Sequence, residues 1–275
     1  MHKYKLSEVL EKRKISRDRI FELTRKNLIT FELRKNAKYY SLSQIDSALK
    51  KNLEDAKKNY KINKSIKTNY KAIELFSGCG GLAFGFKNSG IDSELLVEID
   101  NDSCDTLTAN FSNSMIICDD IANVDFLPYQ GKIDIVAGGF PCQAFSYAGK
   151  SKGFEDTRGT LFFDFARAVK EVKPKVAVGE NVKGLISHDK GRTLLTMVKT
   201  LEDLGYNVQY KLLLAQYFNV PQKRERVFIV ATRKDLPNTY KYPEELDYFV
   251  PLEVALKDCP PSEGQEYPER KKEIM

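Results

Sequence analysis

The chain has 275 residues, of which 42% are hydrophobic and 30% are charged. This length allows one large domain, or a large and a small one, with a substantial buried core. No stretch reaches the apolar length of a membrane helix, and residues 1–5 lack the apolar core of a signal peptide. We therefore expect a cytoplasmic protein.

The cysteines and histidines argue against several kinds of site. Five cysteines are scattered along the chain without a short paired spacing, which argues against a disulfide framework and a structural zinc site. Because the chain has only two histidines, we expect neither a histidine-based metal centre nor a Cys-His dyad. No bound metal is expected.

Positive charge is concentrated at the amino-terminal end. The formal net charge is +6, but residues 1–71 carry 20 Lys and Arg against 8 Asp and Glu, which leaves 24 against 30 for the rest. The first segment is thus +12 and the remainder −6. Such a basic segment suits a polyanion, although a solvated, solubilising face has the same composition.

The first 58 residues predict a small helical module with a hairpin. Apolar side chains at helical spacing occur in residues 6–10, and Ser16 is a candidate N-cap for a second helix. Residues 31–33 and 39–40 are typical of two strands. Ser41 begins a capping-box pattern that opens a third helix.

This order of elements is that of a winged helix-turn-helix domain. Its second helix would read a DNA groove, and its basic hairpin would contact phosphates. A helical cap without DNA contacts is the alternative. Residues 59–71 predict a linker, so we expect domains at 1–58 and 72–275. The groove-reading side chains would be Arg17, Arg19, Thr24, Arg25, Lys26 and Asn27.

From residue 72 onward, apolar strands alternate with helical patterns. This alternation is typical of βαβ units and predicts an α/β fold with a parallel sheet. The expected strands are residues 72–75, 94–97, 115–117, 133–137, 176–178, 207–214 and 227–232. The expected helices are residues 82–88, 103–110, 161–172 and 193–204.

The fourth of these strands leads directly to Gly138, Gly139, Phe140, Pro141 and Cys142. A glycine pair after a buried strand predicts a turn whose backbone passes close to another group. In an open α/β sheet, ligands bind outside the carboxyl ends of the strands, so Cys142 would lie at that edge. The alternative is a small buried hydrophobic residue, which free cysteines usually are.

Three other strand ends carry groups suited to an adenosine-containing cofactor. The glycine-rich segment 76–81 opens a helix, and its Phe76 offers a stacking face. Glu98 follows the glycine-rich segment at about the sequence distance at which an acid binds ribose hydroxyls in nucleotide-binding α/β folds. Asp120 could accept from an exocyclic amine. Each acid could instead cap a helix, and dinucleotides also use such a glycine loop.

An acid and a group of cations complete the candidate site. Glu180 follows the fifth strand at the same edge as Cys142, and an acid there could take up the charge that develops when a thiolate adds to an electron-rich ring. Lys223, Arg224 and Arg226 precede the last strand and suit phosphates or a base carbonyl. A salt-bridged strand entry is the alternative.

Four blocks, in this order, resemble the signature motifs of the cytosine-5 DNA methyltransferases, as found in bacterial restriction-modification systems. They are Phe76-x-Gly78-x-Gly80-Gly81, Gly139-Phe140-Pro141-Cys142-Gln143, Glu180-Asn181-Val182 and Gln222-Lys223-Arg224-Glu225-Arg226. Residues 152–163 are also similar to the family's active-site loop. The resemblance covers residues 72 to about 233 and implies a Rossmann-like methyltransferase sheet.

The resemblance implies S-adenosylmethionine as the cofactor. Phe76 would lie beside the adenine, and Glu98 would bind the ribose. Asp120 and Ile121 would surround the adenine. The other candidates for cofactor contact are Gly78, Gly80, Gly81, Leu82, Ile99, Gly139, Pro141 and Leu161.

The resemblance also implies methyl transfer to C5 of a cytosine that is flipped out of double-stranded DNA. The Cys142 thiolate would add at C6, and Glu180 would protonate or hydrogen-bond N3. Arg226, with Arg224 nearby, would hold O2. The loop 146–159 would close over the base and exclude water. The candidates for substrate contact are Phe140, Gln143, Ser146, Asn181 and Val182.

The family continues after its arginine-rich block into a recognition domain and a segment that closes the cofactor pocket. Residues 234–275 are too few for these, so we expect a fragment, or half of a split enzyme whose second polypeptide supplies recognition.

Two alternatives remain open, namely tRNA methylation and a catalytically inactive DNA-binding regulator. An NAD-dependent oxidoreductase leaves Cys142 and Glu180 unexplained. Through its DNA, the protein would be associated with the nucleoid.

Overall fold

The computed structural model describes residues 2–60, 67–141, 161–237 and 239–259. The chain divides into two compact units. Among the described residues, the first unit comprises 2–60, 216–222 and 245–259, and the second comprises 67–141, 161–215, 223–237 and 239–244. Two stretches of the expected 72–275 domain therefore group with the amino-terminal module.

The first unit joins a small antiparallel sheet to helices. Its strands are β1 (Lys3–Lys5), β2 (Phe31–Arg34) and β3 (Ala37–Ser41), in the order β1-β3-β2. Its helices are α1 (Leu6–Arg13), α2 (Arg17–Arg25), α3 (Leu42–Asn59) and α8 (Leu252–Ala255). The strand β1 was not expected, because three residues with two lysines show no apolar alternation. Pairing with β3 forms it.

Side-chain caps begin α2 and α3 where the sequence predicts them. Ser16 Oγ accepts from the amide of Arg19 at 3.2 Å, and Ser41 Oγ accepts from the amide of Gln44 at 3.5 Å. Each bond satisfies an N–H of the first turn that has no partner within the helix. Both N-cap predictions are confirmed.

The second unit is built on a seven-stranded sheet of order β6-β5-β4-β7-β8-β10-β9. The strands β4 to β8 run parallel, whereas β10 is antiparallel to both of its neighbours. The expected α/β sheet is confirmed, and every expected strand is present. They are β4 (Lys71–Leu75), β5 (Asp92–Glu98), β6 (Met115–Cys118), β7 (Ile135–Gly138), β8 (Val176–Val182), β9 (Tyr206–Leu214) and β10 (Glu225–Arg233).

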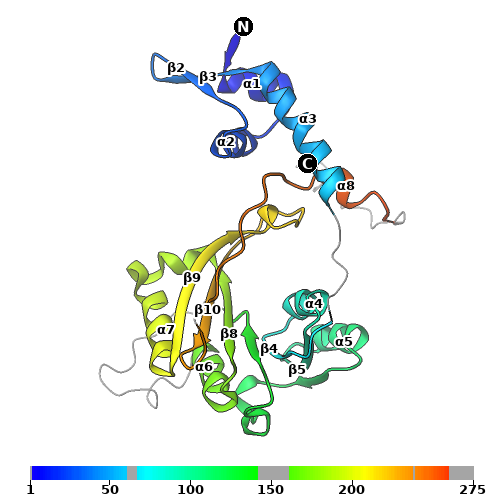
Figure 1. Ribbon diagram of the computed structural model, residues 1–275, viewed down its shortest axis with the longest axis vertical. Helices are drawn as coiled ribbons and strands as arrows, with labels where there is room; N and C mark the ends of the chain where they lie inside the picture. Colours follow the sequence, from blue (N-terminus) through cyan, green and yellow to red (C-terminus); the bar gives the residue numbers. More distant parts are fainter. Residues whose placement is uncertain (1, 61–66, 142–160, 238, 260–275) are drawn as a thin grey trace. The chain divides into compact units, whose positions relative to one another are not determined.

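Helices cover both faces of this sheet. Leu95 and Val97 of β5 pack in the large core shared with α6 and α7, whereas Leu96 between them packs against α4 and α5. Successive strand residues point to opposite faces, which produces this division. Figure 1 shows α4 and α5 beside β4 and β5, and α6 and α7 beside the strands β8 to β10. The bounds are α4 (Gly81–Asn88), α5 (Asn101–Asn110), α6 (Leu161–Val172) and α7 (Arg192–Asp203).

The first strand of this sheet in the chain, β4, lies between β5 and β7, so the chain adds strands on one side of it first and crosses to the other side later. Ligands of open α/β sheets bind at such a switch point, outside the carboxyl ends of the strands. Short 3₁₀ turns connect several elements. They are η1 (Ile121–Asn123), η2 (Leu127–Tyr129), η3 (Lys183–Ile186), η4 (His188–Gly191) and η5 (Ala215–Tyr217).

A disulfide joins Cys104 of α5 to Cys118 of β6. The sequence argument against disulfides does not hold for this pair. The two cysteines are 14 residues apart, but α5 begins just after β5, whose neighbour is β6, so the first turns of the helix meet the end of that strand. Cys79 and Cys259 are free and exposed. In the described part of the chain, no helix is both long and apolar enough to cross a bilayer.

Candidate active site

The glycine-rich segment turns sharply from β4 into α4. Phe76 has a backbone φ of +56°, which is rare for a bulky residue and costs on the order of 1–3 kcal/mol. Gly80 has a φ of +86°, and a Cβ there would meet the Phe111 ring at 2.5 Å, so only glycine fits. A Cβ on Gly81 would meet nothing within 4 Å. Since packing does not require glycine at 81, the open space beside it suits a ligand.

Glu98 ends β5 and is held by the main chain of two loops. Its Oε2 accepts from the Gly78 amide at 2.7 Å, and its Oε1 accepts from the amides of Ile99 and Asp100 at 2.8 and 3.0 Å. A carboxylate offers about four acceptor positions, and the described residues fill three of them, so one remains on Oε2. That position can accept a ribose hydroxyl.

The turn after β6 carries the other expected adenine contacts. Asp120 Oδ1 accepts from the Ala122 amide at 3.0 Å and caps η1. The neighbouring Ile121 is 4% exposed, so most of its side chain belongs to the core. Ile99, in contrast, is 66% exposed and presents an apolar surface beside Glu98.

A buried carboxyl group lies behind the glycine loop. Glu74 of β4 is 2% exposed, and its Oε2 has no hydrogen-bond partner among the described residues. Burial raises the pKa of Glu74 to about 8, while the amides of Leu82 and Ala83 at the start of α4 oppose that rise. Sequence reasoning missed this residue, although an acid inside an apolar strand is a signal that could have found it.

The turn after β7 is fixed by buried side chains. The Phe140 ring is 2% exposed and lies 5.3 and 5.4 Å from the rings of Phe162 and Phe165, centroid to centroid. Asn181 of β8 is 3% exposed and donates from Nδ2 to the Phe140 carbonyl at 2.8 Å. Both residues were expected to contact substrate. Their side chains instead lie in the interior, where they hold the main chain that precedes Cys142.

Glu180 lies in β8, two residues before the end of the strand and beside this turn. Its Oε2 is 3.4 Å from the position that a Cβ on Gly139 would take. Its Oε1 accepts from Nη2 of Arg224 at 3.2 Å and forms an ion pair with Nε of Arg226 at 2.9 Å. The strand register explains the contact, because Arg226 pairs with Val182, two residues along the same face from Glu180.

The structure thus brings Glu180, Arg224 and Arg226 together beside Gly139. The predictions for Cys142, Gln143 and Ser146, and for the loop 146–159, concern residues outside the described part of the chain. Of the other expected contacts, Leu82 and Leu161 are half-buried at the starts of α4 and α6, and Val182 and Pro141 are exposed.

A pocket of about 260 Å³ lies at the opposite edge of the sheet. Its lining includes Lys71, Ser93 and Ser114, at the amino ends of β4, β5 and β6. It includes neither the glycine loop nor Glu180, so it is separate from the groups described above.

The glycine-rich turn, Glu98 and the group of Glu180 with two arginines lie within a segment that matches a known protein family. Residues 70–259 match the family model described as C-5 cytosine-specific DNA methylase. The chain belongs to that family. Enzymes of this family and the structural neighbours below are methyltransferases that use S-adenosylmethionine, so the expected cofactor is confirmed at the level of the family.

Two curated relatives show how much of such a protein the chain represents. The Type II methyltransferase M.Eco47II of Escherichia coli is 47% identical over 255 residues, which are 87% of this chain and 60% of that protein. M.PspPI of Psychrobacter sp. is 53% identical over 216 residues, which are 75% of this chain and 52% of that protein. The chain therefore spans little more than half the length of these relatives.

Solved structures agree on the fold. A DNA modification methyltransferase encoded within an E. coli prophage superposes with a TM-score of 0.58 at 28% identity, over 70% of this chain and 56% of that one. A DNMT2 variant from Spodoptera frugiperda gives a TM-score of 0.51 at 25% identity, over 65% and 54%.

Proposed function

We propose that this chain transfers a methyl group from S-adenosylmethionine to C5 of cytosine in double-stranded DNA. The observation that carries the proposal is the convergence of Arg224 and Arg226 on Glu180, whose second oxygen faces the Gly139 turn three residues before Cys142. The family match over residues 70–259 and the Type II methyltransferases among the relatives support the same reaction.

The residues at the carboxyl ends of β4, β5 and β6 fit the methyl donor. Open space at Gly81 admits its close approach, Glu98 keeps one acceptor position for a ribose hydroxyl, and Asp120 would accept from the adenine amine. Phe76 and Ile99 would contribute apolar surface. S-Adenosylmethionine, when bound, supplies an electrophilic methyl group.

The chain's own residues would activate the cytosine. The Cys142 thiolate would form a bond to C6 while the C5–C6 double bond opens, which moves electron density to C5 and toward N3. Glu180 would hold a proton at N3, and Arg226 would bind O2. After C5 has received the methyl group, its proton would pass to water while the bond between C6 and the sulfur breaks, which restores the C5–C6 double bond and releases the thiolate. The proton at N3 would return to Glu180. The base must leave the duplex for this, because C5 and C6 are stacked inside it.

Recognition of a particular DNA site is a separate requirement. Since the matched segments are 60% and 52% of the two relatives, we propose that further residues, either on the same polypeptide or on a second one, select the site. Binding to DNA would keep the protein with the nucleoid.

The proposal is tested by following labelled methyl groups from S-adenosylmethionine into duplex DNA and into tRNA. Nuclease digestion and mass spectrometry should find 5-methyl-2′-deoxycytidine in the DNA. Label in tRNA alone would favour the RNA alternative. DNA binding without transfer to either substrate, with a candidate second polypeptide supplied, would favour the inactive regulator.

A further inference from the structure

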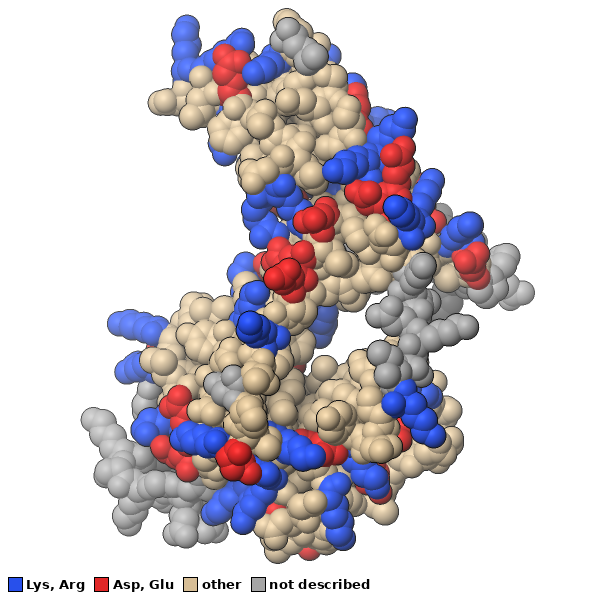
Figure 2. Space-filling model, viewed as in Figure 1, with Lys and Arg blue, Asp and Glu red and all other residues tan. Residues whose placement is uncertain are grey.

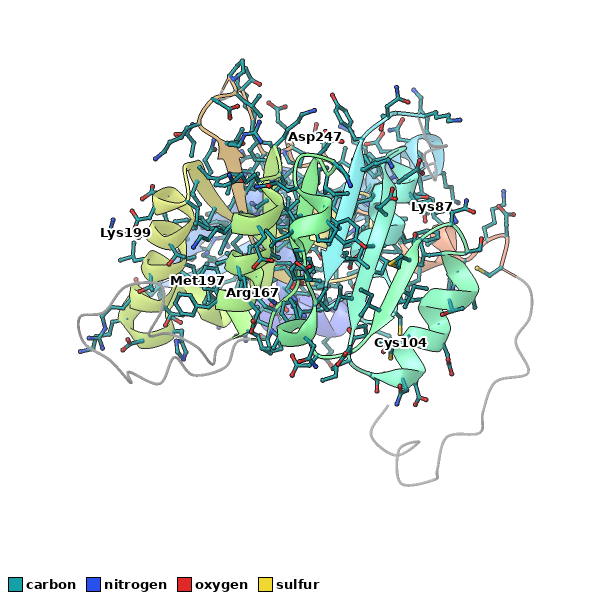
Figure 3. All side chains as sticks on the ribbon, turned by 90° about the horizontal axis from the view of Figure 1, so that it is seen from below. Lys87, Cys104, Arg167, Met197, Lys199 and Asp247 are labelled. Carbon is teal, nitrogen blue, oxygen red and sulfur yellow. A yellow bond between two sulfur atoms is a disulfide. The ribbon has the colours of Figure 1, made fainter. Side chains whose placement is uncertain are left out.

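We propose that Arg167 of α6 is a positioning residue that fixes the turn 120–124 and thereby lets Asp120 distinguish the adenine of the methyl donor from hypoxanthine. This inference rests on the proposed function, because it concerns how that cofactor is selected. None of the sequence motifs includes Arg167, which lies on the second turn of α6. Figure 3 shows it on that helix.

Arg167 binds two main-chain carbonyl groups of the turn. Its Nη2 donates to the carbonyl of Ile121 at 2.7 Å, and its Nη1 donates to the carbonyl of Val124 at 3.0 Å. These carbonyls belong to the two ends of η1, the single helical turn that Asp120 caps. One rigid guanidinium group therefore spans the turn that carries the acid.

Further contacts fix the guanidinium group itself. Its central carbon lies 5.2 Å from the centroid of the Phe126 ring. Nη1 lies 3.4 Å from Glu171 Oε2, which also accepts from the Phe126 amide at 3.3 Å. Nε lies 3.7 Å from Asp164 Oδ1. The side chain is 28% exposed, so these contacts are partly shielded from water.

Charge makes Arg167 necessary at this place. Burial raises the pKa of Asp164, the charge of Asp120 adds to that rise, and Arg167 opposes it. The Arg167 guanidinium group thus faces the carboxylates of Asp164 and Glu171. It also faces the carbonyl oxygens of Ile121 and Val124. Loss of the cation would leave these negative groups to repel one another and would displace the turn.

Lysine cannot replace arginine here. The guanidinium fork presents several N–H groups in one plane and reaches both carbonyls at once, whereas an ammonium group is a point charge on a flexible stem. Arg167→Lys would keep the charge but lose the two-point attachment. Asp120 would then no longer be held where it accepts from the 6-amino group that adenine has and hypoxanthine lacks.

The test compares the affinities of S-adenosylhomocysteine and S-inosylhomocysteine by calorimetry. A site that hydrogen-bonds an amine rejects an analogue without it, so the unsubstituted chain should prefer the adenosyl compound. Arg167→Lys should reduce this preference at least about tenfold, equivalent to about 1.4 kcal/mol. Because a ratio of affinities cancels the folded fraction, partial unfolding of the variant does not imitate the effect.

Arg233→Lys is the matched control. Arg233 donates to the Lys173 carbonyl at 2.7 Å and pairs with Asp235, at the opposite edge of the sheet. Its substitution removes the same kind of bond and should leave the preference unchanged. In an Asp120→Ala background, which has no acceptor at this position, Arg167→Lys should have no further effect on the ratio, because it acts through Asp120.

The outcomes separate the two proposals. If the unsubstituted chain discriminates and Arg167→Lys discriminates equally, the inference is overturned while the proposed function stands. If Arg167→Lys and Arg233→Lys reduce the preference alike, Arg167 has only a general structural role and the inference is again overturned. If the unsubstituted chain binds neither compound, both proposals are overturned.

Discussion

Basic side chains make different contacts in the two units of this chain. In the second unit, Arg224 and Arg226 converge on one oxygen of Glu180 at the ends of two strands. In the first unit, the cations of α2 and of its C-cap residue Lys26 contact rings and main chain. The Arg19 guanidinium carbon lies 4.0 Å from the centroid of the Phe249 ring, and Lys26 Nζ donates to the Leu246 carbonyl.

The difference shows why charge alone does not identify a DNA-reading helix. Arg25 also pairs with Glu245 at 2.9 Å, so three of the six expected groove-reading residues contact the segment 245–249. Burial lowers the pKa of Arg19 and of Lys26. In the view of Figure 2, cationic and anionic side chains are interspersed on the surface. DNA recognition by α2 remains a prediction, and Arg17, Arg25 and Asn27 are its exposed candidates.

The largest effect on the rate of methyl transfer should come from substitution of Glu180, on which Arg224 and Arg226 converge. Glu180→Gln keeps the size of the side chain but removes the carboxyl group that would hold a proton at N3, and general acid catalysis contributes roughly 10²–10⁴-fold. Steady-state methyl transfer should therefore fall by at least about 100-fold. Lys183→Gln, which removes the nearby surface pair with Glu225, should retain activity. Equal rates for Glu180→Gln and the unsubstituted chain would contradict the assignment.

The buried carboxyl group behind the glycine loop should make stability depend on pH. The pKa of Glu74 is raised from 4.5 to about 8, so between these values the folded chain keeps a proton that the unfolded chain has released. Stability should therefore fall as pH rises through this window, on the order of 3 kcal/mol. Glu74→Gln carries no such proton, and its advantage in the free energy of unfolding should grow from pH 5 to pH 8.5 in denaturant titrations. An advantage that is independent of pH would show that Glu74 does not titrate there.

Much of the second unit could be predicted from the sequence. Its strands are short apolar runs, and parallel strands bring the residues after them to one edge, which places Glu98, Asp120 and Glu180 there. The reversal of β10, the Cys104–Cys118 disulfide and the role of Arg167 could not be predicted in the same way. They depend on which elements become neighbours in space, and the spacing of apolar residues along the chain does not determine which elements are neighbours.

In the first unit, two matched arginines on α2 can separate packing from DNA recognition. Arg19 is half-buried over Phe249, whereas Arg17 is exposed. Arg19→Gln should lower the free energy of unfolding by about 1–2 kcal/mol, because a shielded cation–ring contact is lost. Arg17→Gln should leave it unchanged. Thermal denaturation measures both. A loss of stability for Arg17→Gln as large as that for Arg19→Gln would contradict the distinction.

DNA affinity at several salt concentrations completes this comparison. If α2 reads DNA, Arg17→Gln should weaken binding and reduce the salt dependence by about one unit of slope. If the cations of α2 serve only packing, both variants should bind DNA as the unsubstituted chain does.

The smallest effect concerns the helix caps. Ser16→Ala removes the acceptor of the Arg19 amide and should cost about 1 kcal/mol of stability, whereas Ser16→Asp should restore it. Chemical denaturation should show this order. Equal stabilities of the Ala and Asp variants would mean that the cap contributes nothing.

The central claim is that Cys142 attacks the cytosine ring, and covalent trapping tests it most directly. Fluorine at C5 cannot leave as a proton does, so a duplex with 5-fluorocytosine at the target site should hold the protein after methyl transfer. With S-adenosylmethionine and any required second polypeptide, we expect a denaturation-resistant adduct whose peptide map places the DNA on Cys142, and no adduct with Cys142→Ser. An adduct with Cys142→Ser, or methylated product without any trapped protein, would contradict the account.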